Sequence, residues 1–244
     1  MALPLDKTYL LLALQKGTID LQGQFLNSSN YTFLAQLDYE DQRLPVVYKP
    51  VRGERPLWDF PAQTLSRREA AAFLFSELLG WNLVPPTIYR RKGPLGRGSL
   101  QIYIQHDPQD HYFNFSAADR QRLRPFALFD LLINNADRKG GHILRDADGD
   151  LWGIDHGVCF HVEEKLRTVI WDFAGEPLPG DLMADVSRVA EELASRESSE
   201  RLSLLRLLRP AEVNGIIRRA RRLLKAGVFP LPGNDRRAYP WPPV

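Results

Sequence analysis

The sequence of 244 residues contains a single cysteine, Cys159, and no long apolar run. One cysteine excludes an internal disulfide and a cysteine-based zinc site, so packing must hold the fold, as in proteins of a reducing compartment. No run approaches the roughly 20 apolar residues that a membrane-spanning helix needs. The apolar stretch 10–14 follows only one basic residue and precedes no cleavage site, which indicates folded structure rather than a signal peptide. We therefore expect a cytoplasmic protein without a transmembrane segment.

The chain also lacks a strong excess of charge of either sign. Its 32 basic and 30 acidic residues leave a formal charge of +2, which is too small to indicate a nucleic-acid partner. The basic stretch 216–225 could bind an anionic surface, or it could form an amphipathic helix with its apolar residues packed inward and its arginines in water. We expect the second arrangement and no nucleic-acid partner.

Two kinds of local pattern divide the chain. Short apolar and β-branched runs between turn-forming residues predict antiparallel strands up to about residue 50, and again at 87–91 and 98–106. Helical spacing of apolar residues predicts one helix between these groups of strands, at 66–79. Beyond them we expect a helix at 116–133, capped by Ser116, in which Pro125 either makes a kink or starts the helix proper. We also expect a small hairpin that turns at Asp148 and Gly149, and helices at 181–195, 200–208 and 210–226.

The order of these elements predicts an α+β fold of two lobes that meet directly. Residues 1–106 would form an N-terminal antiparallel β lobe with one helix, and residues 107–244 a mainly helical C-terminal lobe. The proline-rich tail 230–244 cannot continue a helix. We expect its aromatic residues to pack on the helical lobe; the alternative is a docking segment for another protein.

Lys49 and Glu69 are candidate partners. Lys49 ends an apolar strand, where an inward-facing lysine would be a costly buried charge, and Glu69 in the following helix could pair with it. Each residue also has a plainer interpretation. Lys49 could be a strand-end lysine in solvent, and Glu69 could form a capping box with Ser66. The sequence leaves both interpretations open.

Asp137 and Asp155 are the candidate carboxylates. Asp137 follows an apolar helix in the run NNADRKGGH, and Asp155 ends a short buried strand just before Gly157, where the backbone can turn. A carboxylate that leaves a buried strand needs a cation, and a divalent metal is the usual one. Phosphoryl transfer requires a cation on the phosphates, carboxylates for the metal and a group that positions the acceptor hydroxyl. The chain offers a candidate for each requirement.

The residues around these carboxylates resemble a known superfamily. The runs NNADRKGGHIL and GIDHG are similar to the catalytic loop and metal-binding motif of the phosphatidylinositol 3- and 4-kinase-related branch of the protein kinase fold, also seen in HipA-like kinases. The runs VVYKP and SRREAAAFLFSELLGWNLVPP resemble the strand lysine and first helix of the same group, so the resemblance spans about residues 17–161. It implies a bilobal protein kinase-like fold. It also implies a kinase that uses ATP with Mg²⁺ or Mn²⁺ on a hydroxyl of a protein, a lipid or a small molecule.

The resemblance assigns a role to each residue that matches a motif. Lys49 would contact the α- and β-phosphates of the nucleotide, and Glu69 would hold Lys49. Asp137 would orient the acceptor hydroxyl, with Lys139 beside it in the catalytic loop. Asp155 would bind the metal.

Other matches are looser. A loop with Ser28 and Ser29 would cover the phosphates in place of a glycine-rich loop, and Gln105 would lie near the adenine. His142 stands where the relatives have an asparagine as second metal ligand, and imidazole prefers softer metals than Mg²⁺. The segment 165–179 occupies the place of an activation or substrate loop.

Two alternatives stay open. The chain could bind nucleotide without turnover, because His142 departs from the motif and weakens the case for catalysis. It could instead be a metal-dependent hydrolase with Asp137, His142, Asp155 and His156 as ligands and His161 as a further candidate, although their spacing matches no familiar ligand pattern.

Overall fold

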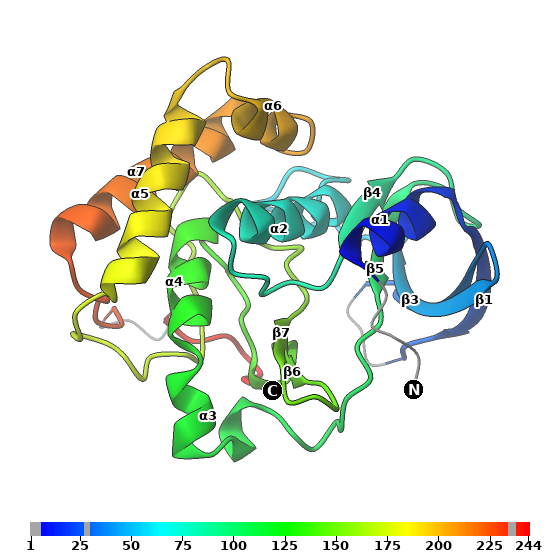
Figure 1. Cartoon of the computed structure of the whole chain (residues 1–244), viewed down its shortest axis with the longest axis horizontal. Coiled ribbons are helices and arrows are strands. Elements are labelled where there is room, and N and C mark those ends of the chain that lie inside the picture. Colours follow the sequence, from blue (N-terminus) through cyan, green and yellow to red (C-terminus); the bar gives the residue numbers. More distant parts are fainter. Residues whose placement is uncertain (1–5, 27–29, 234–237) are drawn as a thin grey trace.

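The structure is a computed structural model that describes residues 6–26, 30–233 and 238–244. The elements of its N-terminal half are α1 (Lys7–Lys16), β1 (Thr18–Gln24), β2 (Phe33–Tyr39), β3 (Gln42–Pro50), the 3-10 helix η1 (Val51–Gly53), α2 (Leu65–Leu79), β4 (Thr87–Arg90) and β5 (Gly98–Ile102). The five strands form an antiparallel sheet in the order β1-β2-β3-β5-β4 (Figure 1). Both helices contact β4 and β5.

Strand β3 decides which side chains face the small core of the sheet. Val46 and Tyr48 are fully buried in a cluster with residues of α1, β2 and β5. Since side chains alternate along a strand, Lys49 points to the other face of β3. That face lies toward α2, because the Ser66 hydroxyl near the start of the helix donates to the Lys49 carbonyl at 3.1 Å.

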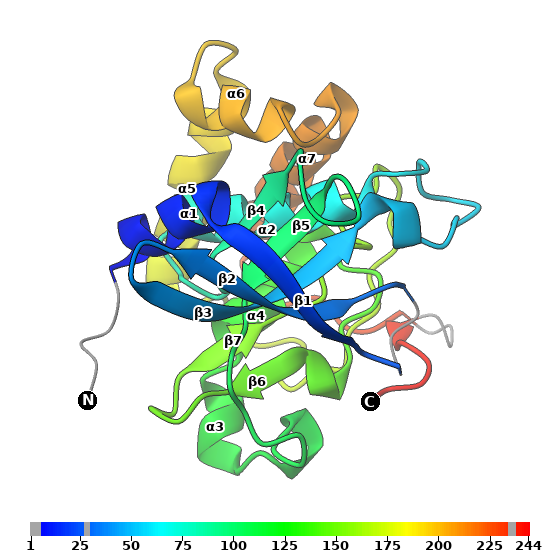
Figure 2. The ribbon, with the colours of Figure 1, turned by 90° about the vertical axis from the view of Figure 1, so that its right-hand side faces the viewer.

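The second half is mainly helical. Its elements are η2 (Tyr112–Asn114), α3 (Ala117–Gln121), α4 (Arg124–Ile133), η3 (Gly140–His142), β6 (Ile143–Arg145), β7 (Leu151–Gly153), α5 (Gly180–Ala194), α6 (Ser199–Leu205) and α7 (Pro210–Ala226). Strands β6 and β7 form the predicted antiparallel hairpin. In Figure 2 the five-stranded sheet lies above this hairpin and α3.

The helix predicted at 116–133 is two helices. Ser116 caps α3, and its hydroxyl oxygen accepts from the backbone N–H of Asp119 at 3.2 Å, as the sequence predicted. The helical path then breaks near Leu123, and α4 begins with Pro125 in its first turn. Proline lacks a backbone N–H and suits the first turn of a helix, so it starts a new helix better than it continues an old one.

Helix α2 contributes its apolar side chains to the core of the helical half. Its Phe75 ring stacks on Phe129 of α4, with ring centroids 5.9 Å apart, and meets the edge of Phe160. Arg68 is buried on the same helix and forms an ion pair with Glu212 near the start of α7. The Arg68 guanidinium also donates to the carbonyl of Cys159 at 2.5 Å. These contacts fix α2 against the helical half.

The basic helix α7 packs largely as expected. Ile216, Ile217, Ala220 and Leu223 are buried, while most of its arginines are exposed. The exception is Arg219, which is 3 % exposed and donates to the carbonyl of Leu132 at 2.8 Å. The expectation that every arginine of this helix faces water is therefore wrong, since α4 ends with carbonyls that this side chain satisfies.

The structure also differs from the sequence-based expectations at both ends of the chain. A helix, α1, accompanies the sheet in addition to the predicted α2. In the tail, Tyr239 is 50 % and Trp241 is 88 % exposed, so the tail does not pack both aromatic rings inward.

Within the described residues, no helix has the length and apolarity to cross a membrane. The division at residue 106 stays a prediction; that residue lies between β5 and η2.

Candidate active site

Lys49, Glu69 and Asp155 meet in one cleft between the sheet, α2 and the β6–β7 hairpin. The Lys49 ammonium lies 2.5 Å from a Glu69 carboxylate oxygen and 2.9 Å from Asp155 Oδ1. The second Glu69 oxygen accepts from the backbone N–H of His156 at 3.0 Å. Burial would lower the pKa of Lys49, but the charges of Asp155 and Glu69 outweigh it and raise the pKa above its ordinary value. The lysine is therefore a fixed cation.

The plainer interpretations of Lys49 and Glu69 are wrong. The Lys49 side chain is only 20 % exposed, so it is not a solvated strand-end lysine. Helix α2 begins at Leu65, which places Ser66 inside its first turn rather than before it. The N-cap residue Thr64 makes no side-chain capping bond, and the carboxylate of Glu54, from the preceding loop, accepts from the backbone N–H groups of Leu65 and Ser66 at 3.2 and 2.9 Å. Glu69 is thus free to pair with Lys49.

Asp137 lies in the same cleft, and its side chain is 36 % exposed. Its backbone N–H donates to the side chain of the buried Asn135 at 3.0 Å, which holds the loop in place. Burial raises the pKa of Asp137 to about 6; the charge of Asp155 adds to this rise and that of Lys139 opposes it. The Lys139 ammonium is 4.0 Å from Asp137.

His142 faces Asp155 across the cleft. Its Nε2 atom lies 3.4 Å from Asp155 Oδ2. Burial lowers the pKa of His142 to about 4, although the nearby Asp155 carboxylate acts in the opposite direction. The imidazole is therefore neutral at physiological pH, and neutral imidazole is the form that binds metal ions. The charge of Lys49 is the main cause of the low pKa of Asp155, which stays ionised.

The donor set fits a metal that arrives with phosphates. Over the residues that the structure describes, no three His, Cys, Asp or Glu side chains form a group that could hold a metal. Asp155 and His142 supply two donors, and Mg²⁺ is commonly bound by one or two protein ligands together with substrate phosphates and water. His156 is buried, and the Arg138 guanidinium donates a hydrogen bond to its Nε2 atom at 2.7 Å. This arrangement argues against the hydrolase alternative, which needs His156 as a ligand.

The backbone turn after β7 occurs at Asp155 itself. Asp155 has a φ of 60°, whereas Gly157 does not have a positive φ. A side chain at Gly157 would place its Cβ 3.4 Å from Leu65 Cβ and 3.6 Å from a Glu69 oxygen. Both distances are ordinary van der Waals contacts, so a Cβ would fit at Gly157, and the turn that the sequence attributed to this glycine is made at Asp155.

Arg138 joins the parts of the site, and the sequence did not single it out. Its guanidinium is fully buried, pairs with Asp130 of α4 at 3.0 Å and donates to the carbonyls of His142 and Ile154. It thereby holds the loop with Asp137 and the strand end before Asp155 at a fixed separation. The one signal in the sequence is Asp130, a charged residue within the apolar run of the helix before the loop.

The cavity at this site measures about 60 Å³. Glu54, Tyr31 and Thr32 line it in addition to the predicted residues, and nothing in their local sequence marked them. Ser28 and Ser29 lie outside the described residues. Gln105 is exposed between β5 and η2 and is not among the residues that line this cavity.

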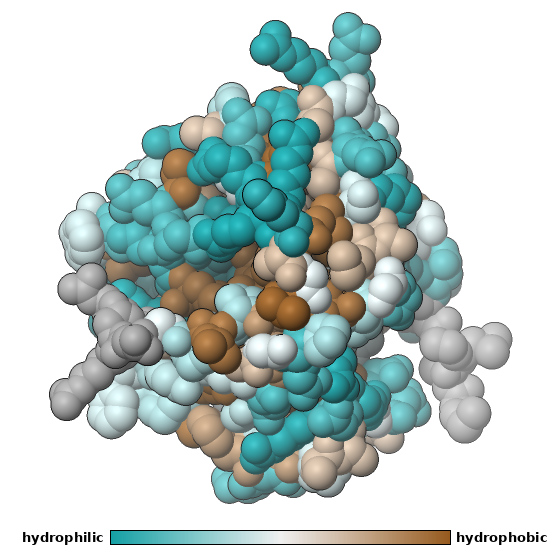
Figure 3. Space-filling model, turned by 90° about the vertical axis from the view of Figure 1, so that its left-hand side faces the viewer, coloured by the Kyte–Doolittle hydropathy of each residue, from teal (hydrophilic) through white to brown (hydrophobic). Residues whose placement is uncertain are grey.

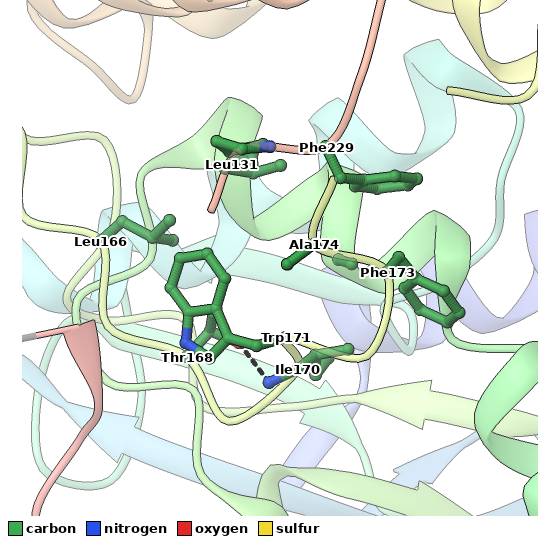
Figure 4. Close-up of a pocket in the computed structure, with 10 residues that line it drawn as sticks. Leu131, Leu166, Thr168, Ile170, Trp171, Phe173, Ala174 and Phe229 are labelled. Carbon is green, nitrogen blue, oxygen red and sulfur yellow. Dashed lines mark hydrogen bonds between the residues drawn. The ribbon is translucent and has the colours of Figure 1, made fainter. Parts of the chain in front are cut away.

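The segment expected to select a substrate is anchored firmly. The Thr168 hydroxyl donates to Asp130 at 3.3 Å and accepts from the backbone N–H of Ile170 at 3.1 Å. Figure 4 shows the Trp171 indole on the side of Leu166 and the Phe173 ring on the side of Phe229. Only about 10 Å³ stays open between these side chains.

A larger cavity of about 890 Å³ lies on the outer side of this segment. Its lining combines the exposed Trp58 with Lys165, Arg167 and apolar residues near the end of α7. Figure 3 views the molecule from the side of α5 and α7, and apolar side chains gather across the middle of this face. The cavity contains none of the residues at the Lys49 cluster, so it is separate from the candidate active site.

Comparison with solved structures defines the class of fold. Hydra Fam20, in a structure with sugar, matches 88 % of the chain and 86 % of its own with a TM-score of 0.57 at 17 % identity. The golgi casein kinase matches with a TM-score of 0.51 at 15 % identity, covering 90 % of this chain and 74 % of its own. The Helicobacter pylori proinflammatory kinase CtkA matches at 0.52 and 11 % identity, covering 88 % and 94 %. The chain therefore has the predicted bilobal kinase-like α+β fold.

The sequence comparison identifies the family. Protein Rv2133c of Mycobacterium tuberculosis is 41 % identical over 264 aligned positions, which cover 94 % of this chain and 93 % of that protein. The chain belongs to the same family as Protein Rv2133c. No protein-family model matches the chain.

Two plant proteins are more distant relatives. Phosphatidylinositol 4-kinase gamma 4 of Oryza sativa subsp. japonica is 29 % identical over 45 % of this chain and 23 % of its own length. The protein of the same name from Arabidopsis thaliana is 28 % identical over 72 % of this chain and 34 % of its own length. The chain thus spans about a third or less of these plant proteins.

Proposed function

We propose that this protein is an ATP- and metal-dependent kinase that transfers a phosphoryl group to a hydroxyl. The observation that carries the proposal is the ion-pair cluster of Lys49, Glu69 and Asp155, with Asp137 in the same cleft. These residues come from a strand, a helix and two loops. Together they provide a fixed cation, the glutamate that pairs with it and two further carboxylates, which are the groups that phosphoryl transfer requires.

Each residue has a distinct part in this proposal. Lys49, held by Glu69, binds the α- and β-phosphates of the nucleotide, and Asp155 with His142 holds the metal ion. The metal ion, when bound, neutralises the negative charge of the phosphates. Asp137 accepts a hydrogen bond from the acceptor hydroxyl and takes its proton, while Lys139 is a cation beside the acceptor. Catalysis of this kind depends on positioning and electrostatic stabilisation more than on covalent chemistry.

We further propose that the protein lies in the phosphatidylinositol 3- and 4-kinase-related branch, with lobes at 1–106 and 107–244. The similarity to the plant 4-kinases supports the branch. The acceptor can be a hydroxyl of a protein, a lipid or a small molecule. Transfer of radiolabelled phosphate from ATP to the protein itself, to bacterial lysate or to lipid extract would separate these three.

Binding of ATP with Mg²⁺ or Mn²⁺ should stabilise the protein measurably. A ligand that binds only the folded state adds about 2.7 kcal/mol at a hundred times its dissociation constant. For a chain of this size that corresponds to a rise in Tm of about 5 to 10 °C. Thermal unfolding with ATP alone, each metal alone and both together tests this. Stabilisation by metal alone, without any effect of nucleotide, would contradict the proposal.

Activity should have an acid limb set by Asp137. A group that takes a proton must be ionised, and the pKa of Asp137 is raised to about 6 by burial, so the carboxyl is protonated at lower pH. We expect kcat/KM to fall as the pH drops through about 6 and to approach a tenfold loss per pH unit below it. Initial rates between pH 4.5 and 8, with circular dichroism to verify folding, measure this. A limb near 3.8, the ordinary value for aspartate, would show that burial does not tune this group.

A further inference from the structure

Residues 238–244 lie against the catalytic loop and against the segment that follows the metal-binding motif. The carbonyl of Ala238 accepts from the backbone N–H of Thr168 at 3.1 Å and from the Trp171 indole N–H at 3.3 Å. Five residues later, the carbonyl of Pro243 accepts from the backbone N–H of Gly140 at 2.8 Å. In Figure 1 the red C-terminal segment ends beside the β6–β7 hairpin.

Both attachment points lie beside the loop that carries Asp137. Gly140 is three residues after Asp137, in the same loop. Thr168 pairs with Arg138 in a parallel bridge, and the backbone N–H of Val169 donates to the Arg138 carbonyl at 3.1 Å. The segment 238–244 therefore contacts the loop that carries Asp137 at two places: directly at Gly140, and through Thr168 at Arg138.

These hydrogen bonds supply the acceptors for the backbone N–H groups of Thr168 and Gly140. A backbone N–H that is buried without a partner is costly, so removal of Ala238 and Pro243 would leave the amides of Thr168 and Gly140 to find new ones. Thr168 is 3 % exposed with the segment in place. Without the segment, these amides would bind water or shift toward another acceptor, and the loop would lose two fixed contacts.

The segment does not plug the site. Asp137 and Asp155 keep 36 % and 48 % of their side chains exposed with the segment in place. Within it, Ala238 and Pro240 are buried, while Tyr239 and Trp241 are half or more exposed. An inhibitory tail would cover the reacting carboxylates, whereas the hydrogen bonds of this one go to two backbone amides and to the Trp171 indole.

We propose that residues 238–244 are a positioning strap that holds Asp137 in the geometry needed for transfer. The strap acts through the amides of Gly140 and Thr168 and touches neither the nucleotide nor the acceptor. The expected effect of the strap on the rate rests on the proposed kinase function. Its expected effect on the position of the loop rests on the contacts alone. Misplacement of a catalytic group by about 1 Å can cost on the order of 100-fold in rate.

Three shortened chains test the strap. A chain that ends at residue 237 loses both attachments, and one that ends at Pro242 loses only the Gly140 contact. A chain that ends at Pro243 keeps an acceptor oxygen for Gly140 and is the matched control. We expect kcat to fall about 10- to 100-fold for the first, less for the second and little for the third, with the KM for ATP unchanged throughout.

Two further measurements separate positioning from simple loss of stability. Hydrogen exchange should accelerate at Gly140 and Thr168 in the chain that ends at 237, and only at Gly140 in the chain that ends at 242. A synthetic peptide of residues 238–244, added in excess, should restore part of the lost rate. Tm values near that of the full chain would show that the shortened proteins are folded.

The outcomes are distinct. Shortened chains that are as fast as the full chain, or faster, overturn the strap, and a faster enzyme would mark an inhibitory tail. Unchanged exchange at Gly140 and Thr168 also overturns it, whether or not transfer is detected. A full chain without any transfer to any acceptor argues against the proposed function, and the exchange data then decide the strap alone.

Discussion

Replacing Asp137 by asparagine should lower phosphoryl transfer by about 100- to 10,000-fold while nucleotide binding persists. The amide keeps the size of the side chain but cannot take a proton from the acceptor. Lys49 pairs with Asp155 and Glu69 and not with Asp137, so the ion-pair cluster should survive. Steady-state transfer and the Tm shift with ATP and metal measure the two effects separately.

Asp155→Asn is the matched comparison, because it should lose both binding and transfer. Its carboxylate pairs with Lys49 and faces His142, so the neutral amide removes a metal donor and a partner of the lysine. If Asp137→Asn lost the Tm shift as well, Asp137 would be a binding residue rather than a base. If Asp137→Asn kept full activity, Asp137 would not be the base.

Arg138→Met should lower the free energy of unfolding by about 3 to 5 kcal/mol. Arg138 and Asp130 are both fully buried and lie 3.0 Å apart. Removal of one partner leaves the other as an uncompensated buried charge, which is the costly way to break such a pair. Chemical denaturation followed by circular dichroism measures the loss.

An exposed ion pair provides the control. Arg43 and Asp38 lie 2.8 Å apart on the surface of the sheet, with 68 % and 43 % of their side chains exposed, so Arg43→Met should change stability by less than about 1 kcal/mol. A double variant, Asp130→Leu with Arg138→Met, should recover part of the loss, because no lone charge is then buried. A loss below about 1 kcal/mol in Arg138→Met would mean that Asp130 is compensated by other groups.

Several elements could be predicted closely because their signals are local. Helix α7 occupies 210–226 as predicted, since Pro210 starts it and Gly227 follows it with a φ of 66°. The hairpin around Asp148 and Gly149 and the Ser116 cap follow from turn and capping chemistry within a few residues. Periodicity also placed α2 to within one residue, at 65–79.

Other features could not be read from local patterns. Arg68 pairs with Glu212, 144 residues away, and a single sequence does not state which distant residue satisfies a buried charge. Arg68 lies in helical register with Ala72, Phe75 and Leu79, which places a charge on the apolar face of the helix. Similarly, Glu54 rather than Ser66 caps α2, because a loop that approaches from outside the helix supplies the better acceptor.

The sequence by itself determined the chemical types and their order along the chain: a strand lysine, a helical glutamate and two aspartates after apolar segments. Tertiary structure alone decided that Lys49, Glu69 and Asp155 share one set of ion pairs, that Arg138 is buried beneath Asp137 and that residues 238–244 return to the same loop. The physical reason is range. Backbone preferences and capping act over a few neighbours, whereas the compensation of buried charge and unpaired amides is settled only when distant segments pack together.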